Sequence, residues 1–212
     1  MQPETTMSEQ KIFEGQVFDL SLRQAQLADG TIVQREIVVN HGAVVIVPLT
    51  ENNEVRLVRQ FRAAAQTWVI ELPAGGLKLN EDPDLAAPRE LLEETGDQAA
   101  TWQKLGGYYS APGILTEFLH LYLATDLTPG PNQLEFDEHI EVLTVPWSEA
   151  IAMISRGEIE DDGTDVALEA GHADQVGRAA GGREDQGSVK TGAAVVVAGD
   201  FGSAQQGTVI ED

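Results

Sequence analysis

Short runs of apolar residues dominate the first third of the chain, and their spacing predicts β-strands. The predicted strands cover residues 13–27, 31–39, 43–49, 54–61 and 67–76. The first two flank Asp29-Gly30, a pair that is typical of a hairpin turn. Residues 43–49 are almost continuously apolar, which favours a strand covered on both faces. The fifth run ends in a glycine turn. This half of the pattern therefore predicts hairpins and one buried strand.

A helix should follow the glycine turn. It begins near Asp82 to Leu85, with Asp82 or Asp84 as its N-cap, and it ends at Gly96. Three glutamates fall within one narrow arc at 100° per residue: Glu90, Glu93 and Glu94. Three leucines lie largely on the other side: Leu85, Leu91 and Leu92. We therefore expect the helix to bury its leucines and to present a carboxylate cluster outward or into a cleft.

The remaining pattern predicts three more strands and another helix. The strands cover residues 102–110, 118–127 and 140–147, and the helix covers residues 148–159. After Leu168 the composition changes, and the glycine- and alanine-rich acidic segment 169–212 contains no leucine. Such a segment buries little apolar surface, so we expect it to be disordered or peripheral. Residues 1–10 are polar, and we expect a flexible N-terminus.

Charge and composition argue against nucleic-acid-binding and membrane-spanning proteins. The net charge is −22, from 35 acidic and 13 basic residues, and such a surface repels nucleic-acid phosphates. We therefore expect no nucleic-acid partner. No apolar run approaches the roughly 20 residues of a membrane helix, and the first residues lack the features of a secretory signal. The chain has no cysteine, which fits a reducing compartment. These features predict a soluble cytoplasmic protein without a membrane partner.

The glutamates belong to a longer pattern. Starting at Gly75, the order is glycine, five residues, Glu81, seven residues, Arg89-Glu90-Leu91, one residue, Glu93-Glu94, one residue and Gly96. This order matches the signature of the Nudix hydrolase family, and the chain resembles that family over roughly residues 11–168. One position departs from the signature, which ends in an aliphatic residue where this chain has Asp97.

The resemblance implies the fold. It is an α/β fold, a Nudix-type α/β/α sandwich with a mixed sheet, preceded by an N-terminal antiparallel β segment. The expected divisions are a flexible stretch (1–10), the β segment (11–42), the Nudix domain (43–168) and the acidic tail (169–212). By the same resemblance, the β segment mediates a homodimer.

The resemblance also implies a metal site. Its ligands would be the carbonyl of Ala74 and the carboxylates of Glu90, Glu93 and Glu94, with Glu93 also contributing to catalysis. Like charges at these helical spacings repel each other, and a divalent cation turns that repulsion into attraction. Hard oxygen ligands suit Mg²⁺, with Mn²⁺ as an alternative. We expect Glu81 and Arg89 to form a stabilising ion pair.

Further sequence features resemble those of the ADP-ribose pyrophosphatase subgroup of the Nudix family. Pro112 lies sixteen residues past Gly96, and residues 58–75 follow the subgroup's pattern. The resemblance implies that Arg62 contacts the phosphate or ribose of the substrate, although it could be a solvated arginine at a strand end. It places Glu71 near the site and suggests that Glu117 lines the pocket. Arg56 and Arg59 are weaker candidates for substrate contacts.

The catalytic base should lie in the loop before the strand at residue 140. Glu138 matches the subgroup's glutamate best, with Glu135, Asp137 and Glu141 as rivals in the same segment. The implied reaction is Mg²⁺-dependent hydrolysis of ADP-ribose to AMP and ribose 5-phosphate. One alternative is cleavage of GDP-mannose or another nucleoside diphosphate sugar. A second, from a different class, is a non-catalytic module that senses nucleotides.

Overall fold

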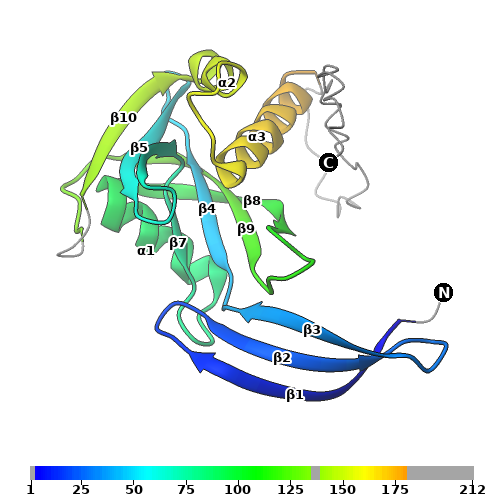
Figure 1. Cartoon of the computed structure of the whole chain (residues 1–212). Helices are drawn as coiled ribbons and strands as arrows, with labels where there is room; N and C mark the ends of the chain where they lie inside the picture. Colours follow the sequence, from blue (N-terminus) through cyan, green and yellow to red (C-terminus); the bar gives the residue numbers. More distant parts are fainter. Residues whose placement is uncertain (1–2, 135–138, 181–212) are drawn as a thin grey trace, which may run out of the picture. The chain divides into compact units, whose positions relative to one another are not determined.

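The computed structural model describes residues 3–134 and 139–180. Its first sheet is antiparallel with the order β1-β2-β3 (Figure 1). The strands are β1 (Thr5–Glu14), β2 (Asp19–Gln26) and β3 (Ile32–Val39). The predicted turn between β2 and β3 is present, with Gly30 at φ 88°. The expectation of a flexible stretch up to residue 10 is wrong from Thr5 onward, because β1 pairs with β2 along its length.

Two further sheets form the rest of the described chain. A mixed four-stranded sheet has the order β7-β4-β9-β8, in which β4 and β9 run parallel and the other pairs run antiparallel. An antiparallel sheet has the order β10-β5-β6. The strands are β4 (Ala43–Pro48), β5 (Glu54–Arg62), β6 (Thr67–Glu71), β7 (Ala74–Gly76), β8 (Gln98–Tyr109), β9 (Phe118–Thr128) and β10 (Ile140–Pro146). The predicted mixed sheet is confirmed.

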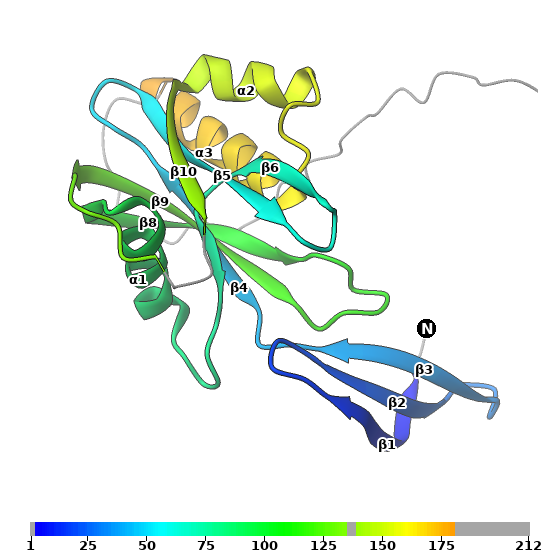
Figure 2. The ribbon, with the colours of Figure 1, turned by 60° about the vertical axis from the view of Figure 1, so that its left-hand side comes forward.

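Strand β4 separates two apolar cores. Val44 and Ile46 pack in a cluster with residues of α1 (Pro83–Thr95). Val45 and Val47 pack in a cluster with residues of α2 (Trp147–Ser155) and α3 (Asp162–Ala180). Because successive strand residues point to opposite faces, the continuous apolar run of β4 serves both cores. Figure 2 shows the helices on the two sides of this strand. None of the helices described here is long and apolar enough to span a bilayer.

Helix α1 begins and ends where the sequence predicts. Asp82 is the N-cap and its Oδ1 accepts a hydrogen bond from the Asp84 N–H at 3.0 Å. Gly96 takes the left-handed conformation with φ 78° at the C-terminal end. The left-handed region strongly favours glycine, which explains why the helix stops there.

The predicted orientation of α1 is partly wrong. Leu91 is buried as expected, but Leu85 is 70% exposed, and Glu90 and Glu94 are only 8% and 4% exposed. Ala86 and Ala87 supply the other buried apolar contacts of the helix. Alanines let the helix approach β4 closely, and the glutamates face β7, where they find polar partners. Contacts with β4 and β7 therefore decide which side chains of α1 are buried, and they do not follow the predicted division into a buried leucine face and an exposed carboxylate face.

Helix α3 crosses the boundary that the sequence suggested at residue 168. It continues to Ala180, and Gly171 lies so close to Trp147 that an added Cβ would come within 2.8 Å of the ring. The expectation of a disordered or peripheral tail is therefore corrected for residues 169–180, which are helical. Residues 181–212 lie outside the described part of the chain.

One buried hydroxyl joins α3 to the segment that leads into β7. Thr164 Oγ1 accepts a hydrogen bond from the Leu72 N–H at 2.8 Å and donates one to Asp161 Oδ2 at 2.7 Å. Thr164 is fully buried, so water cannot replace either bond. Thr164→Val should lower the free energy of unfolding by about 1–3 kcal/mol, because it leaves a buried N–H unpaired. Urea denaturation measures this change.

Thr164→Ser is the matched control. It keeps the hydroxyl and removes one methyl group, so it should destabilise the protein less than Thr164→Val. Equal losses in the two variants would show that packing, and not the hydrogen bond, accounts for the effect.

Candidate active site

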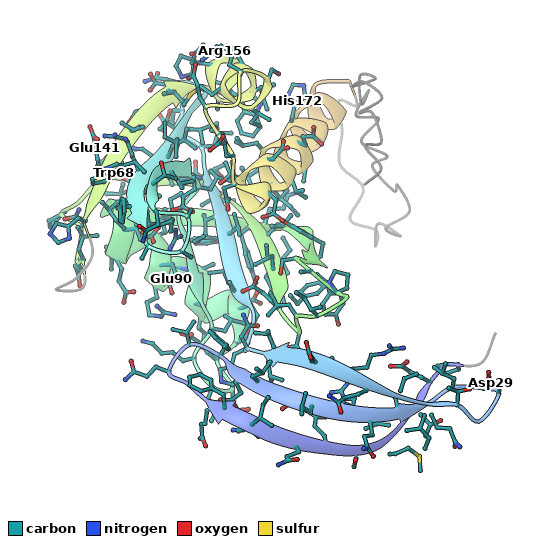
Figure 3. All side chains as sticks on the ribbon, viewed as in Figure 1. Asp29, Trp68, Glu90, Glu141, Arg156 and His172 are labelled. Atoms are coloured by element: carbon teal, nitrogen blue, oxygen red, sulfur yellow. The ribbon has the colours of Figure 1, made fainter. Side chains whose placement is uncertain are left out.

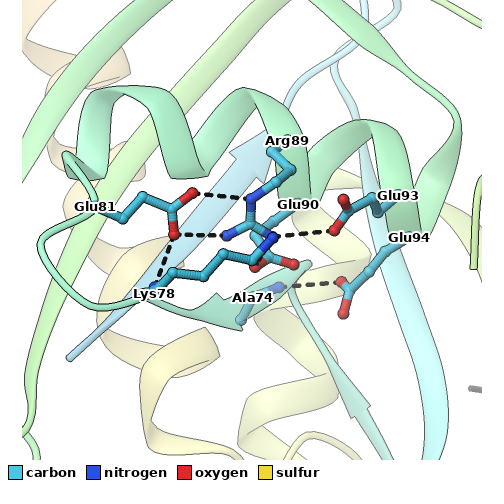
Figure 4. Close-up of polar contacts among 7 residues, drawn as sticks. All are labelled: Ala74, Lys78, Glu81, Arg89, Glu90, Glu93 and Glu94. Atoms are coloured by element: carbon cyan, nitrogen blue, oxygen red, sulfur yellow. Dashed lines mark hydrogen bonds and ion pairs between the residues drawn. The ribbon is translucent and has the colours of Figure 1, made fainter. Parts of the chain in front are cut away.

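Arg89 organises the acidic face of α1. Its guanidinium donates hydrogen bonds to both carboxylate oxygens of Glu81, at 3.0 and 2.9 Å (Figure 4). It also contacts Glu90 Oε1 at 2.6 Å and Glu93 Oε2 at 3.0 Å. Burial opposes the charge of Arg89, but its hydrogen bonds with Glu81 and the charge of Glu90 raise the pKa of the guanidinium. In turn, Arg89 lowers the pKa of the Glu81 carboxyl. The predicted ion pair is thus part of a network of three carboxylates.

Glu94 and Glu90 also lie against the backbone of β7. The Ala74 N–H donates a hydrogen bond to Glu94 Oε2 at 3.1 Å. The Glu90 carboxylate lies where a Cβ on Gly75 would be, so a side chain there would overlap it. Glycine is therefore required at position 75 for a steric reason, and the strand and the helix carboxylates pack directly against each other.

A cavity of about 480 Å³ opens beside this packing. Ala74 and Gly75 line it, and so do the three predicted substrate residues, Arg62, Glu71 and Glu117. The structure thus brings together residues from β5, β6, β7 and the segment before β9. The carboxylates of α1 are not among the lining residues, but Glu90 lies against Gly75, which lines the cavity.

Arg62 and Glu71 form an ion pair at one side of the cavity. Arg62 Nε lies 2.9 Å from Glu71 Oε1, and Glu71 is only 4% exposed. Burial raises the pKa of the Glu71 carboxyl, and the hydrogen bond from Arg62 acts in the opposite direction. Arg62 is therefore held by a specific partner in this conformation, and its guanidinium still lines the cavity.

Glu117 is held by two residues that the sequence did not suggest. Its Oε1 accepts a hydrogen bond from Asn40 Nδ2 at 2.7 Å, and its Oε2 accepts one from Ser110 Oγ at 2.8 Å. Both partners line the same cavity. They lie 77 and 7 residues away in sequence, and neither belongs to a motif, so no sequence signal pointed to them.

The predicted base and two of its rivals, Glu138, Glu135 and Asp137, lie outside the described residues. The third rival, Glu141, is on β10, and its Oε2 lies 3.3 Å from Arg59 Nη1. The guanidinium of Arg59 also lies 4.9 Å from the centroid of the Trp68 ring, on the same side of this sheet (Figure 3). Glu141 does not line the cavity.

The donor chemistry of α1 suits a hard divalent cation. Glu81, Glu90, Glu93 and Glu94 together carry more negative charge than Arg89 neutralises, and all offer oxygen ligands. Within residues 3–134 and 139–180, no three acidic, histidine or cysteine side chains are gathered closely enough to form a ligand set. Arg89 Nη1 contacts both Glu90, at 2.6 Å, and Glu93, at 3.0 Å.

Comparison with known proteins gives a matching family and several similar enzymes. The model of the NUDIX domain family matches residues 39–163. The chain is 34% identical over 168 residues to ADP-ribose pyrophosphatase from Bacillus subtilis (strain 168), covering 78% of this chain and 91% of that protein. It is 37% identical over 172 residues to ADP-ribose pyrophosphatase from Mycobacterium tuberculosis (strain ATCC 25618 / H37Rv), covering 79% and 83%.

Two other similarities concern substrate and fold. The chain is 33% identical over 184 residues to GDP-mannose pyrophosphatase from Escherichia coli (strain K12), covering 79% of this chain and 95% of that protein. The crystal structure of ADP compounds hydrolase superposes with a TM-score of 0.76 at 20% identity, covering 84% of this chain and 97% of the other. The latter similarity supports the fold.

The contact between Gly75 and Glu90 leads to a prediction. Gly75→Ala should lower turnover by about tenfold or more, because it would displace the carboxylate of Glu90, an expected metal ligand, and a displacement of roughly 1 Å is costly. Its effect on stability should be small, because the displaced atoms are the end of a flexible side chain. Steady-state kinetics and thermal unfolding measure the two effects.

Gly76→Ala is the matched control on the same strand. A Cβ at position 76 would meet no atom within 4 Å and would leave Glu90 in place, so this variant should lower turnover less than Gly75→Ala, although Gly76 also lines the cavity. Similar losses in both variants would mean that β7 tolerates no side chain for reasons unrelated to Glu90.

Proposed function

The chain belongs to the Nudix hydrolase family, and we propose that it hydrolyses ADP-ribose to AMP and ribose 5-phosphate. The main support is one arrangement: Glu90 and Glu94 pack against the backbone of Ala74 and Gly75, next to a cavity of about 480 Å³. A carboxylate cluster beside a cavity of this size suits a diphosphate substrate whose charge must be neutralised by a cation.

Nudix hydrolases generally use divalent metal cations. In this chain the ligands would be the Ala74 carbonyl and the carboxylates of Glu90, Glu93 and Glu94, with Mg²⁺ as the expected ion and Mn²⁺ as an alternative. When bound, the cation supplies neutralisation of the diphosphate and activation of water. The network around Arg89 supports this role, because it keeps the carboxylates of one helical turn close together despite their repulsion.

The cavity residues would bind and orient the substrate. Arg62 carries a positive charge at the cavity wall and is suited to a phosphate oxygen, which would compete with Glu71 for the guanidinium. Glu117 is fixed by two hydrogen bonds and offers an acceptor for substrate hydroxyls. The oxygen of water would attack one phosphorus of the diphosphate while the bond from that phosphorus to the bridging oxygen breaks, and the attacking water would lose a proton to a base. The bridging oxygen would leave on the other phosphate, so that the two products are AMP and ribose 5-phosphate.

A second substrate is supported by the similarity to GDP-mannose pyrophosphatase. Both reactions cleave a nucleoside diphosphate sugar between its phosphates, so the same carboxylates and the same cation would serve either one. The difference would lie in the contacts with the base and the terminal sugar.

We also propose a cytoplasmic homodimer. The N-terminal sheet supports an intersubunit role, because large apolar side chains are exposed on it: Met7, Ile12, Phe13, Val17, Phe18 and Ile32 lie on the sheet or in its β1–β2 loop. The absence of cysteine fits the reducing cytoplasm. Sedimentation of the purified protein would test the dimer.

A panel of substrates tests the proposed reaction. ADP-ribose should be hydrolysed with a higher kcat/KM than GDP-mannose, and chelation of divalent cations should abolish both activities. Chromatography of the products, with Mg²⁺ and with a chelator, makes the measurement. Tight binding of ADP-ribose without turnover in excess Mg²⁺ would instead identify a nucleotide sensor.

Glu94→Gln tests the metal assignment. It should reduce turnover by orders of magnitude with a nearly unchanged unfolding midpoint, because it removes a charged ligand and retains the side-chain volume. Glu51→Gln, at an exposed turn residue, is the control for loss of one carboxylate and should behave as the unchanged protein. Full activity of Glu94→Gln would contradict the assignment.

The identity of the base is tested separately. We propose Glu138, so Glu138→Gln should slow the chemical step by about 10²–10⁴-fold and should leave cation affinity largely unchanged. Glu141→Gln should have a smaller effect, because Glu141 pairs with Arg59 and does not line the cavity. Single-turnover kinetics of both variants decide between them, and the reverse ranking would assign the base to Glu141.

A further inference from the structure

An ion pair with a buried carboxylate lies directly after helix α1. Asp97 is 2% exposed and lies next to Gly96, the residue that ends α1. Its Oδ2 lies 3.2 Å from Nε of Arg56, which is on β5. Nη1 of Arg56 donates a hydrogen bond to Thr144 Oγ1 on β10 at 2.6 Å. The guanidinium of Arg56 therefore connects the end of α1 to two strands of the β10-β5-β6 sheet.

Stability alone does not account for this pair. Among the described residues, neither Arg56 Nε nor Asp97 Oδ2 makes a hydrogen bond, so the two charges are close but poorly aligned. Moving charges out of water is costly, and replacing a buried ion pair with apolar residues is often neutral or stabilising. An aliphatic residue, which the Nudix signature has at this position, would avoid that cost.

The pair acts on the end of α1 that carries the proposed metal ligands. Glu93 and Glu94 lie in the last turn, four and three residues before Asp97. Backbone hydrogen bonds hold this turn locally, from Gly96 N–H to the Leu92 carbonyl at 3.0 Å and from Gln133 N–H to the Glu93 carbonyl at 2.9 Å. The ion pair adds a link to β5 and β10, across the interface between helix and sheet.

Small rotations of this helix would matter for the reaction. Side-chain ends lie roughly 5–6 Å from a helix axis, so a rotation of about 10° moves them by about 1 Å. A misplacement of about 1 Å can lower a reaction rate roughly 100-fold. A pair of opposite charges restricts such a rotation, because its energy depends on where the two groups lie, whereas apolar contacts are not directional.

We propose that Arg56 and Asp97 are positioning residues: their ion pair fixes the rotation of α1 about its axis and thereby places Glu93 and Glu94. This inference rests on the proposed function for its activity readout. It also makes a prediction about cation binding, which can be measured without any substrate.

The test separates positioning from stability with three variants: Arg56→Leu, Asp97→Leu and the double variant. Arg56→Leu leaves the buried carboxylate of Asp97 unpaired and should lower the unfolding midpoint clearly, whereas Asp97→Leu leaves a guanidinium that is 24% exposed and should lower the midpoint less. The double variant should regain a midpoint close to that of the unchanged protein. If the pair positions the helix, the double variant still shows a kcat lowered about tenfold or more, with KM changing less, and a several-fold higher Kd for Mn²⁺ by electron paramagnetic resonance.

The double variant Glu149→Leu/Arg156→Leu is the matched control. It removes an ion pair of 2.7 Å between exposed residues and should leave both kcat and the Kd for Mn²⁺ unchanged. Unchanged kcat and Kd in the Arg56→Leu/Asp97→Leu protein would overturn the proposal and would make the pair purely structural.

A further variant tests the proposal if the Arg56→Leu/Asp97→Leu protein does not fold. Asp97→Asn keeps the shape of the side chain and removes its charge, so a folded protein with a raised Kd for Mn²⁺ supports the proposal and an unchanged Kd overturns it. Failure of the proposed function would give a different result, because the unchanged protein would then hydrolyse none of the diphosphates. The Kd for Mn²⁺ would still show whether the ion pair positions Glu93 and Glu94.

Discussion

The site depends on the way Arg89 and the backbone of β7 hold mutually repelling carboxylates together. Glu81, Glu90 and Glu93 all contact one guanidinium, and Glu94 contacts the Ala74 N–H. Without these partners, burial of Glu90 and Glu94 would carry a large desolvation cost. The contacts with Arg89 therefore offset part of the repulsion between Glu90 and Glu93.

The fold provides the surface against which this helix packs. Strand β4 gives alternate side chains to two cores, and α1 rests on one of them through Ala86, Ala87 and Leu91. Small residues bring the helix close enough for Glu90 to reach the space left by Gly75. The cavity beside β7 is also lined by Arg62 of β5 and Glu71 of β6.

Asp97 shows how a departure from a motif can be accommodated. The aliphatic residue expected after Gly96 would complete an apolar contact under the helix, and a lone buried carboxylate there would be strongly destabilising. Arg56 on β5 supplies the opposite charge, and Thr144 supplies an acceptor for the same guanidinium. The compensation comes from strands that are distant in sequence, so a motif that ends at residue 97 could not reveal it.

The sequence by itself determined the hairpin at Asp29-Gly30, the two ends of α1, the buried strand β4 and the Nudix signature. Each of these depends on local chemistry: a turn that needs glycine, a cap that needs a side-chain oxygen, or a spacing along one helix. Only the tertiary structure decided that α1 buries Glu90 and Glu94 and exposes Leu85, that Asn40 and Ser110 hold Glu117, and that α3 continues past residue 168. These features depend on partners from distant segments, because the cost of burying a charge or a backbone group is set by what lies opposite it, and one segment cannot specify that.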